Sequence, residues 1–224
     1  LSSVVVVDDD RWREFIPGRR SPREQFARQA MLLGAAGQHL VGAVSFAVIG
    51  LGGTGNLASL ALVHQGARRL VLVDDEFLDE SNLPRVPASA PADVKVRSKV
   101  DLARAYALAH APDIEVTALM QNVEHGSVLP FLVGCDVMVV CTDNTTSRAY
   151  LNQLAQQYLI PLLDLGVQFS IGDAGAVANE IGRINLVRPG TPCLWCSGHI
   201  SSERLEAESV PKAERNREGS YLRG

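Results

Sequence analysis

A glycine-rich segment is the first place in the chain where residue type and spacing indicate chemistry. VIGLGGTG, residues 48–55, fits the pattern G-x-G-x-x-G with Gly50, Gly52 and Gly55, and Gly53 lies in the same loop. The first glycine allows a tight turn, the second lets the backbone approach phosphate oxygens, and the third permits close helix–strand packing. The following helix presents unpaired N–H groups and a positive dipole end to an anion. The segment therefore predicts a nucleotide-phosphate site, for which NAD and ATP are both suitable ligands.

An acidic residue stands where a ribose-binding carboxylate is expected. Asp74 ends the apolar run RLVLVD, about 20 residues beyond the last glycine of the loop. The loop is also preceded by AVSFAVIG, typical of a strand, and followed by TGNLASLALVHQG, typical of a helix. A glycine turn that served packing alone would need no acid at this distance. The combination favours a nucleotide site, although it does not separate NAD from ATP.

Cationic residues around the same predicted crevice favour ATP. The segment ESNLPR supplies Asn82 and Arg85, Lys95 and Lys99 follow, and Arg28 lies upstream on a predicted helix. Arginine and lysine neutralise a triphosphate whose phosphates react, whereas NAD does not need several such cations. Arg85 taken alone could equally be a solvated loop charge. The preference for ATP comes from the joint placement of these residues.

The run CTDN adds a carboxylate at the end of a later predicted strand. It places Asp143 and Asn144 at the carboxyl edge of the sheet, where ligands of such folds bind. A carboxylate there can hold Mg²⁺, a metal that NAD does not require. Asp143 alone could instead be the N-cap of the helix that starts at TTSRAYL.

These residues need a scaffold of alternating strands and helices. Apolar strand-like runs and helix-like runs alternate from AVSFAVIG to IPLLDLGVQ, and Gly-punctuated segments such as AGAVANEIGRINLV follow as later strands or hairpins. Alternating β and α units imply a mainly parallel sheet covered on both faces. We therefore predict an α/β fold, a Rossmann-like doubly wound sheet with some antiparallel strands in its C-terminal part.

The two ends of the chain lack the alternating strand and helix pattern of its centre. In residues 1–20 a β-branched run is followed by DDD and PGRR, which predicts a lead-in strand and linker at the edge of a preceding domain. Ser21, Pro22 and Glu24 have the spacing of an N-cap, a first helical proline and a capping box. Residues 21–224 are predicted to form one ATP-binding domain, and polar residues 197–224 to be a helix or a mobile loop.

Composition excludes several classes of protein. A net charge of −4 in 224 residues gives no electrostatic case for nucleic acid or an anionic membrane. The apolar runs are shorter than the roughly 20 residues that span a bilayer. Four cysteines are too few for a disulfide scaffold and suit a reducing compartment. We expect a cytoplasmic protein.

The ordered set of motifs resembles the ThiF/MoeB/ubiquitin-activating-enzyme (E1-like) superfamily. ARQ, VIGLGGTG, VLVDDEFLDESNLPR, SKVDLA, CTDN and TPCLWC occur in the family's order from about Glu24 to Cys196. The resemblance implies a ThiF-type adenylation domain that uses ATP and Mg²⁺. It implies as partner a ubiquitin-like or sulfur-carrier protein, whose C-terminal carboxylate becomes an acyl-adenylate with release of pyrophosphate. It also implies a homodimer.

The resemblance assigns roles residue by residue. The glycine loop would hold ATP, and Asp74 would take the ribose. Asn82, Arg85 and Lys99 would contact the phosphates. Lys99 is preferred to Lys95 because SKVDLA matches the family's K-V-x-x-A stretch.

Two further roles, and one departure, concern the edge of the site. Asp143 would hold Mg²⁺, and Arg28 would reach the phosphates of the partner subunit. Pro84 stands where the family usually has a polar residue, which puts the substrate details of this loop in doubt but not the ATP site.

The chemistry of adenylation explains why no general base is evident. The attacking carboxylate is already ionised at pH 7, so catalysis consists of positioning and of neutralising negative charge. Two alternatives stay open. One is an NAD(P)-dependent oxidoreductase, and the other is a catalytically silent E1-like subunit that binds a ubiquitin-like partner.

The cysteines raise the question of zinc. Cys193 and Cys196 form a C-x-x-C, half of a four-thiolate Zn²⁺ site. No cysteine follows Cys196, and His199 would be only a third ligand. Cys135 and Cys141 are expected to be buried small hydrophobes rather than nucleophiles. The resemblance also implies a thioester-forming cysteine after the zinc region, and residues 197–224 contain none. Because the closing strand and helix of the family do not follow at YLRG, the domain is predicted to be C-terminally truncated.

Overall fold

A six-stranded sheet forms the centre of the molecule. The computed structural model describes residues 4–8, 11–15, 24–171 and 177–209. The strand order is β5-β4-β3-β6-β7-β8, and all neighbours are parallel except β7 and β8. The strands are β3 (Ser45–Ile49), β4 (Arg69–Val73), β5 (Glu115–Leu119), β6 (Val137–Val140), β7 (Leu162–Ile171) and β8 (Val177–Val187).

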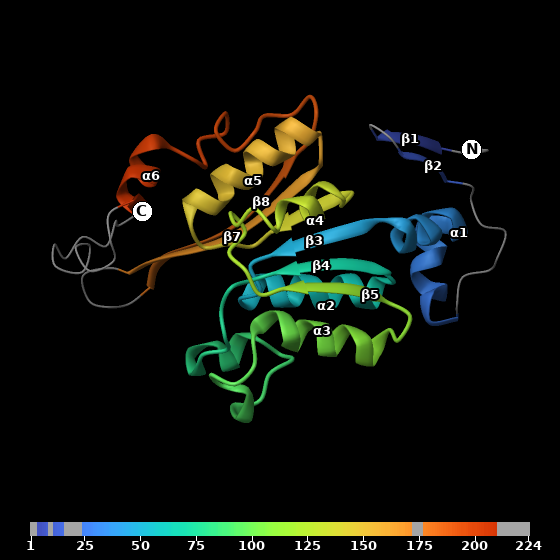
Figure 1. Cartoon of the computed structure of the whole chain (residues 1–224), viewed down its shortest axis with the longest axis horizontal. Helices are drawn as coiled ribbons and strands as arrows, with labels where there is room; N and C mark the ends of the chain where they lie inside the picture. The colour runs from blue at the N-terminus through green and yellow to red at the C-terminus, as the bar shows by residue number, and fades with distance from the viewer. Residues whose placement is uncertain (1–3, 9–10, 16–23, 172–176, 210–224) are drawn as a thin grey trace.

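Helices cover both faces of this sheet (Figure 1). Those that lie over the faces are α2 (Gly53–Gln65), α3 (Lys99–His110), α4 (Leu129–Val133) and α5 (Thr145–Tyr158). α2 and α3 lie on one face and α4 and α5 on the other (Figure 1). α1 (Ala27–Ala43), α6 (Ser202–Ser209) and three short 3₁₀ turns, η1 (Glu24–Phe26), η2 (Glu80–Arg85) and η3 (Pro91–Asp93), complete the described elements.

Two apolar clusters hold the layers together. One lies beneath α4 and α5 and includes Met138 and Leu151, while the other lies beneath α2 and α3 and includes Leu72 and Val100. The central strands are apolar along their length because both of their faces are buried, as is usual for parallel sheets. The predicted α/β architecture, with antiparallel pairing confined to the C-terminal part, is confirmed.

Glycine positions end or bend helices as predicted. α2 stops at Gly66, which adopts the left-handed conformation with φ of 97°, a usual role for glycine at a helix C-terminus. The first predicted helix does stop near Gly34, where φ is 71°, and the next turn of helix continues directly so that α1 contains a kink.

The N-terminal part differs from the prediction. β1 (Val4–Asp8) agrees with the predicted lead-in strand, but residues 11–15, predicted as linker, form a strand, β2 (Arg11–Phe15). The two strands pair antiparallel in a separate sheet. The alternation in RWREF is a weak strand signal because three of its five residues are charged. The predicted capping residues Ser21 and Pro22 lie outside the described residues.

None of the helices in the described ranges is long and apolar enough to cross a bilayer.

Candidate functional site

The glycine loop joins β3 to α2 at the carboxyl edge of the sheet. Gly50 has φ of 83°, and a Cβ added to it would lie 2.9 Å from the backbone carbonyl carbon and oxygen of Cys141. A Cβ on Gly55 would lie 1.7 Å from the carbonyl oxygen of Gly50. Both positions therefore require glycine, one for backbone conformation and close approach, the other for the contact between helix and loop.

The same loop leaves an open approach to the start of α2. Gly52 is the N-cap of α2 and has no side-chain capping bond, and a Cβ added there would meet nothing within 4 Å. Gly53 is different, since its Cβ would lie 3.2 Å from side-chain carbons of Arg85. The structure thus brings Arg85 against the helix N-terminus, where an anion would bind.

Asp74 is bonded to the glycine loop. Its Oδ2 accepts a hydrogen bond from the Leu51 N–H at 2.6 Å, and its Oδ1 accepts one from the Glu76 N–H at 2.9 Å. Burial raises the pKa of Asp74 above its usual value, against the opposing effects of the Leu51 hydrogen bond and the positive charge of Lys99. The carboxylate at the end of β4 is therefore fixed beside the loop, as the sequence predicted.

Lys99, and not Lys95, is placed toward this carboxylate. The Lys99 side chain is 6% exposed and its Nζ pairs with Oε2 of Glu76. Lys95 is exposed and adopts a left-handed backbone conformation with φ of 58°. The structure therefore places Lys99 near Asp74, while its choice as the phosphate lysine stays a prediction.

Asn82 is held by the turn that precedes Arg85. It is buried, and its Oδ1 accepts a hydrogen bond from the Asp79 N–H at 3.1 Å, while Asp79 in turn accepts from the Ser81 N–H at 3.0 Å. This reciprocal capping fixes η2, so Asn82 and Arg85 are presented from one short rigid turn.

The CTDN segment lies beside the glycine loop. Asp143 is exposed, and the N-cap of α5 is its neighbour Asn144, whose Oδ1 accepts from the Ser147 N–H at 2.7 Å. The alternative role of Asp143 as N-cap is therefore wrong. Thr142 Oγ1 is buried and has no hydrogen-bond partner among the described residues. Just beyond the end of β6, an exposed carboxylate thus directly follows a buried hydroxyl that has no partner among the described residues.

Asn144→Ala should lower the free energy of unfolding by about 0.5–2 kcal/mol, because α5 would lose its side-chain cap. Urea denaturation followed by circular dichroism measures this change. The control is Gln156→Ala, which replaces an exposed residue of the same helix and should change the free energy of unfolding by less than about 0.5 kcal/mol. Equal stability of the two variants would contradict the capping role.

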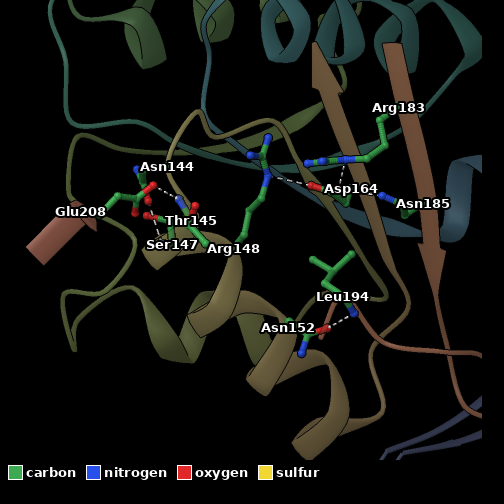
Figure 2. A network of polar contacts seen from close by, with 10 residues as sticks. All are labelled: Asn144, Thr145, Ser147, Arg148, Asn152, Asp164, Arg183, Asn185, Leu194 and Glu208. Atoms are coloured by element: carbon green, nitrogen blue, oxygen red, sulfur yellow. Dashed lines mark hydrogen bonds and ion pairs between the residues drawn. The ribbon is translucent and has the colours of Figure 1, made fainter. Parts of the chain in front are cut away.

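Two sets of polar contacts around α5 were not predicted from the sequence. Glu208 on α6 accepts hydrogen bonds from the Thr145 and Thr146 N–H groups at 2.6 and 2.9 Å. Burial by itself raises the pKa of Glu208, but these hydrogen bonds outweigh that effect and hold the pKa below its usual value. The second is a network around Asp164, which Arg148, Arg183 and Asn185 contact (Figure 2).

Arg28 lies away from the crevice of its own chain. Its neighbour Gln29 donates a hydrogen bond to the carbonyl oxygen of Gln65 at 2.8 Å, at the C-terminal end of α2. The glycine loop is at the other end of that 13-residue helix, which is about 20 Å long at 1.5 Å per residue. Arg28 is exposed, so a role in phosphate binding would have to be exerted on another subunit.

The C-x-x-C pair forms one corner of a loop bound to α5. The Sγ atoms of Cys193 and Cys196 are 3.5 Å apart, and the Leu194 N–H between them donates to Asn152 Oδ1 at 2.9 Å. Partial burial by itself raises the pKa of Cys193, but hydrogen bonds from Cys196 outweigh this effect and lower the pKa below its usual value. Within the ranges that the structure describes, no group of three or more His, Cys, Asp or Glu side chains could hold a metal ion.

Of the other two cysteines, Cys135 is buried, as predicted, and Cys141 is half-buried. Cys135 packs in the cluster beneath α4 and α5. Burial, and then the negative charge of Asp164, raise the pKa of Cys141 to about 12. At neutral pH its side chain is therefore a thiol, which is a poor nucleophile.

The four cysteines should differ in their rates of alkylation. With iodoacetamide at pH 7.5, Cys193 and Cys196 should be modified at least about 10-fold faster than Cys141 and Cys135, because thiolate content and exposure set the rate. Peptide mass spectrometry of a time course measures this order. Early modification of Cys141 would contradict the burial and pKa described for it.

Comparison with known proteins adds a family match and several relatives. Residues 26–218 match the ThiF family. The SAMP-activating enzyme E1 of Haloferax volcanii is 29% identical over 190 residues, which cover 84% of this chain and 65% of the relative. The sulfur carrier protein ThiS adenylyltransferase of Escherichia coli is 32% identical over 142 residues, 62% of this chain and 56% of that protein.

Solved structures share the fold. The crystal structure of Escherichia coli MccB with ATP aligns with a TM-score of 0.66 at 21% identity, over 88% of this chain and 59% of that chain. The crystal structure of Escherichia coli MccB with MccA-N7isoASN aligns with a TM-score of 0.68 at 20% identity, over 85% of this chain and 58% of that chain. The chain thus spans between about half and two thirds of the length of the relatives it matches.

Proposed function

The chain belongs to the ThiF family, and from this premise we propose that it is an ATP-dependent adenylyltransferase. Its substrate is the C-terminal carboxylate of a ubiquitin-like or sulfur-carrier protein, which it converts to an acyl-adenylate with release of pyrophosphate. The observation that carries the proposal is the grouping of Asp74, Lys99 and Arg85 around a glycine loop whose helix N-terminus is open to an anion.

The nucleotide would lie along the carboxyl edge of the sheet. Asp74 at the end of β4 accepts the ribose hydroxyls, and the N–H groups at the start of α2 face the phosphates. Arg85, Lys99 and Asn82 neutralise and orient the triphosphate. Lys99 now pairs with the exposed carboxylate of Glu76, a partner that it can exchange for a phosphate oxygen without leaving its place.

Asp143 would hold Mg²⁺ next to the phosphates, with Asn144 fixing the chain beside it. The exposed carboxylate and the unsatisfied Thr142 hydroxyl fit a hard cation, which prefers oxygen ligands. When bound, Mg²⁺ supplies charge neutralisation for the departing pyrophosphate. The protein groups position the two substrates.

Zinc fits this chain less well. Cys193 and Cys196 are close enough to share a metal, but a structural zinc site needs four ligands, and the described residues contribute no third one to the pair. We therefore derive no step from zinc at this loop.

Arg28 is proposed to act across a homodimer. It is exposed on α1 about one helix length from its own site, and its neighbours Met31 and Leu32 expose 88% and 86% of their surface. An apolar helix face beside an arginine suits a subunit contact that delivers the guanidinium to the partner's phosphates. A cytoplasmic location, where ATP is supplied, completes the proposal.

Calorimetric titration with ATP–Mg²⁺ and with NAD tests the nature of the nucleotide. We expect micromolar to submillimolar binding of ATP and at least about 100-fold weaker binding of NAD, because NAD leaves the cations of the phosphate site uncompensated. Lys99→Ala should weaken ATP binding, while Lys95→Ala, the matched exposed lysine, should not. Binding of NAD without ATP would contradict the proposal.

A further inference from the structure

A fully buried carboxylate on β7 holds two arginines. Asp164 has 0% exposed surface, and its Oδ1 accepts from Arg148 Nε at 2.9 Å, while its Oδ2 accepts from Arg183 Nε at 3.2 Å and from Asn185 Nδ2 at 3.0 Å. Figure 2 shows the guanidinium of Arg183 pointing toward that of Arg148, with Asp164 between them. Three elements, α5, β7 and β8, thus converge on one carboxylate.

This network carries one more positive charge than negative. The Arg148 and Arg183 side chains are 14% and 20% exposed, and Asp164 is the sole carboxylate paired with either of them among the described residues. Partial burial, followed by the positive charge of Arg183, lowers the pKa of His199 nearby, as expected in a region of positive potential. A poorly solvated cation without a full counter-charge is costly, so the pair is suited to receive an anion.

The hydrogen-bonding pattern leaves the outer ends of both arginines free. Each uses Nε toward Asp164, and in the part of the chain that the structure describes the terminal Nη atoms have no hydrogen-bond acceptor. Gly166 makes room for this arrangement, because a Cβ there would lie 3.1 Å from Arg183 Nη2 and 3.3 Å from its Cζ. The guanidinium of Arg183 therefore packs closely over Gly166, and a side chain at this position would move it by a few tenths of an ångström.

The location relates the pair to the nucleotide. Along the sheet, Asp74 ends β4, the glycine loop follows β3, and Asp143 follows β6. Asp164 stands on the next strand, where it pairs with Val140 of β6 and with Asn185 of β8. Neighbouring strands are about 4.8 Å apart, so the arginine pair lies one strand beyond the proposed metal and phosphate region, on the side away from the ribose.

We propose that Arg148 and Arg183 form the subsite that binds the ionised C-terminal carboxylate of the carrier protein, with Asp164 as the positioning residue that aims both guanidinium groups. The inference rests on the proposed adenylyltransferase function. Guanidinium forks match carboxylate geometry, and one bound carboxylate would bring the network to electrical neutrality. One carboxylate oxygen then bonds to the α-phosphorus as the bond from α-phosphorus to the bridging oxygen breaks, and the electron pair leaves with pyrophosphate.

The test compares a carrier with a free C-terminal carboxylate and the same carrier with a C-terminal amide. The probes are a panel of sulfur-carrier and ubiquitin-like proteins, ThiS among them, and binding is followed by calorimetry in the presence of a non-hydrolysable ATP analogue. The intact chain should bind the acid form about 10- to 100-fold more tightly than the amide, the range expected for charge-assisted hydrogen bonds. Arg183→Gln should remove most of this preference and leave ATP binding within about twofold.

Asn185→Ala is the matched control, because it removes a contact to Asp164 without removing a charge. It should keep the acid preference within about threefold of that of the intact chain, and Arg183→Lys should restore part of the preference lost in Arg183→Gln. The inference is overturned if Arg183→Gln keeps the full preference for the acid form. It is also overturned if Arg183→Gln and Asn185→Ala each weaken the binding of the acid and of the amide equally. An intact chain that binds neither form of any probe would count against the proposed function itself.

Should Arg183→Gln fold poorly, Arg148→Gln provides the second variant, since it removes the other guanidinium of the pair. The acid preference should fall there too, and an unchanged preference in a folded Arg148→Gln protein would overturn the inference.

Discussion

Asp143→Ala should reduce ATP–pyrophosphate exchange by at least about 100-fold while leaving the protein folded. Asp143 is exposed and caps no helix, since Asn144 performs that function for α5. Its removal therefore takes away the proposed metal ligand and little else. Loss of one preorganised electrostatic group typically costs 10²- to 10³-fold in rate.

The matched control for this variant is Asp75→Ala. Asp75 is also an exposed carboxylate at the carboxyl edge of the sheet, and it makes only a 3.4 Å contact to Asn122. Exchange should change by less than about threefold in this control. Exchange that is unaffected by Asp143→Ala would show that the metal assignment is wrong, even if ATP is still the substrate.

Two glycine substitutions in the same loop should give opposite phenotypes. In Gly55→Ala the new Cβ would lie 1.7 Å from the carbonyl oxygen of Gly50, and both groups are backbone-bound, so α2 or the loop must move. Forced overlap in a packed site typically costs 1–3 kcal/mol or more, and this overlap is severe. We expect a loss of at least about 3 kcal/mol in the free energy of unfolding, measured by urea denaturation.

Gly52→Ala should instead leave stability nearly unchanged and weaken ATP binding by at least about 10-fold. A Cβ there meets nothing within 4 Å, and φ of −66° suits alanine. The methyl group would occupy space through which phosphate oxygens approach the N–H groups of α2. Equal destabilisation by both substitutions, or unchanged ATP affinity in Gly52→Ala, would contradict the roles given to these two glycines.

Local patterns in the sequence predicted which residues lie around the glycine loop. The glycine loop, Asp74 and Lys99 come from consecutive β and α units, and in a parallel sheet the ends of such strands meet at one edge. Their proximity therefore follows from the alternation of elements. The site roles proposed for them stay predictions until they are measured.

Contacts across long sequence separations could not be predicted in this way. Arg183 reaches Asp164 only because β7 and β8 pair antiparallel with one particular register, which the Gly-punctuated sequence between the two strands does not define. Glu208 caps α5 from 63 residues away. Arg28 lies far from the glycine loop of its own chain. This position depends on the kinked path of α1, which the helical periodicity does not define.

The most direct test of the account is ATP–pyrophosphate exchange with radiolabelled pyrophosphate, measured with the intact chain, Mg²⁺ and a candidate carrier protein. Exchange should require the carrier and should be lost when its C-terminal carboxylate is replaced by an amide, because the carboxylate is the nucleophile. Exchange that proceeds equally with the amidated carrier, or binding of NAD in place of ATP, would contradict the assignment of this chain as a carboxylate-activating adenylyltransferase.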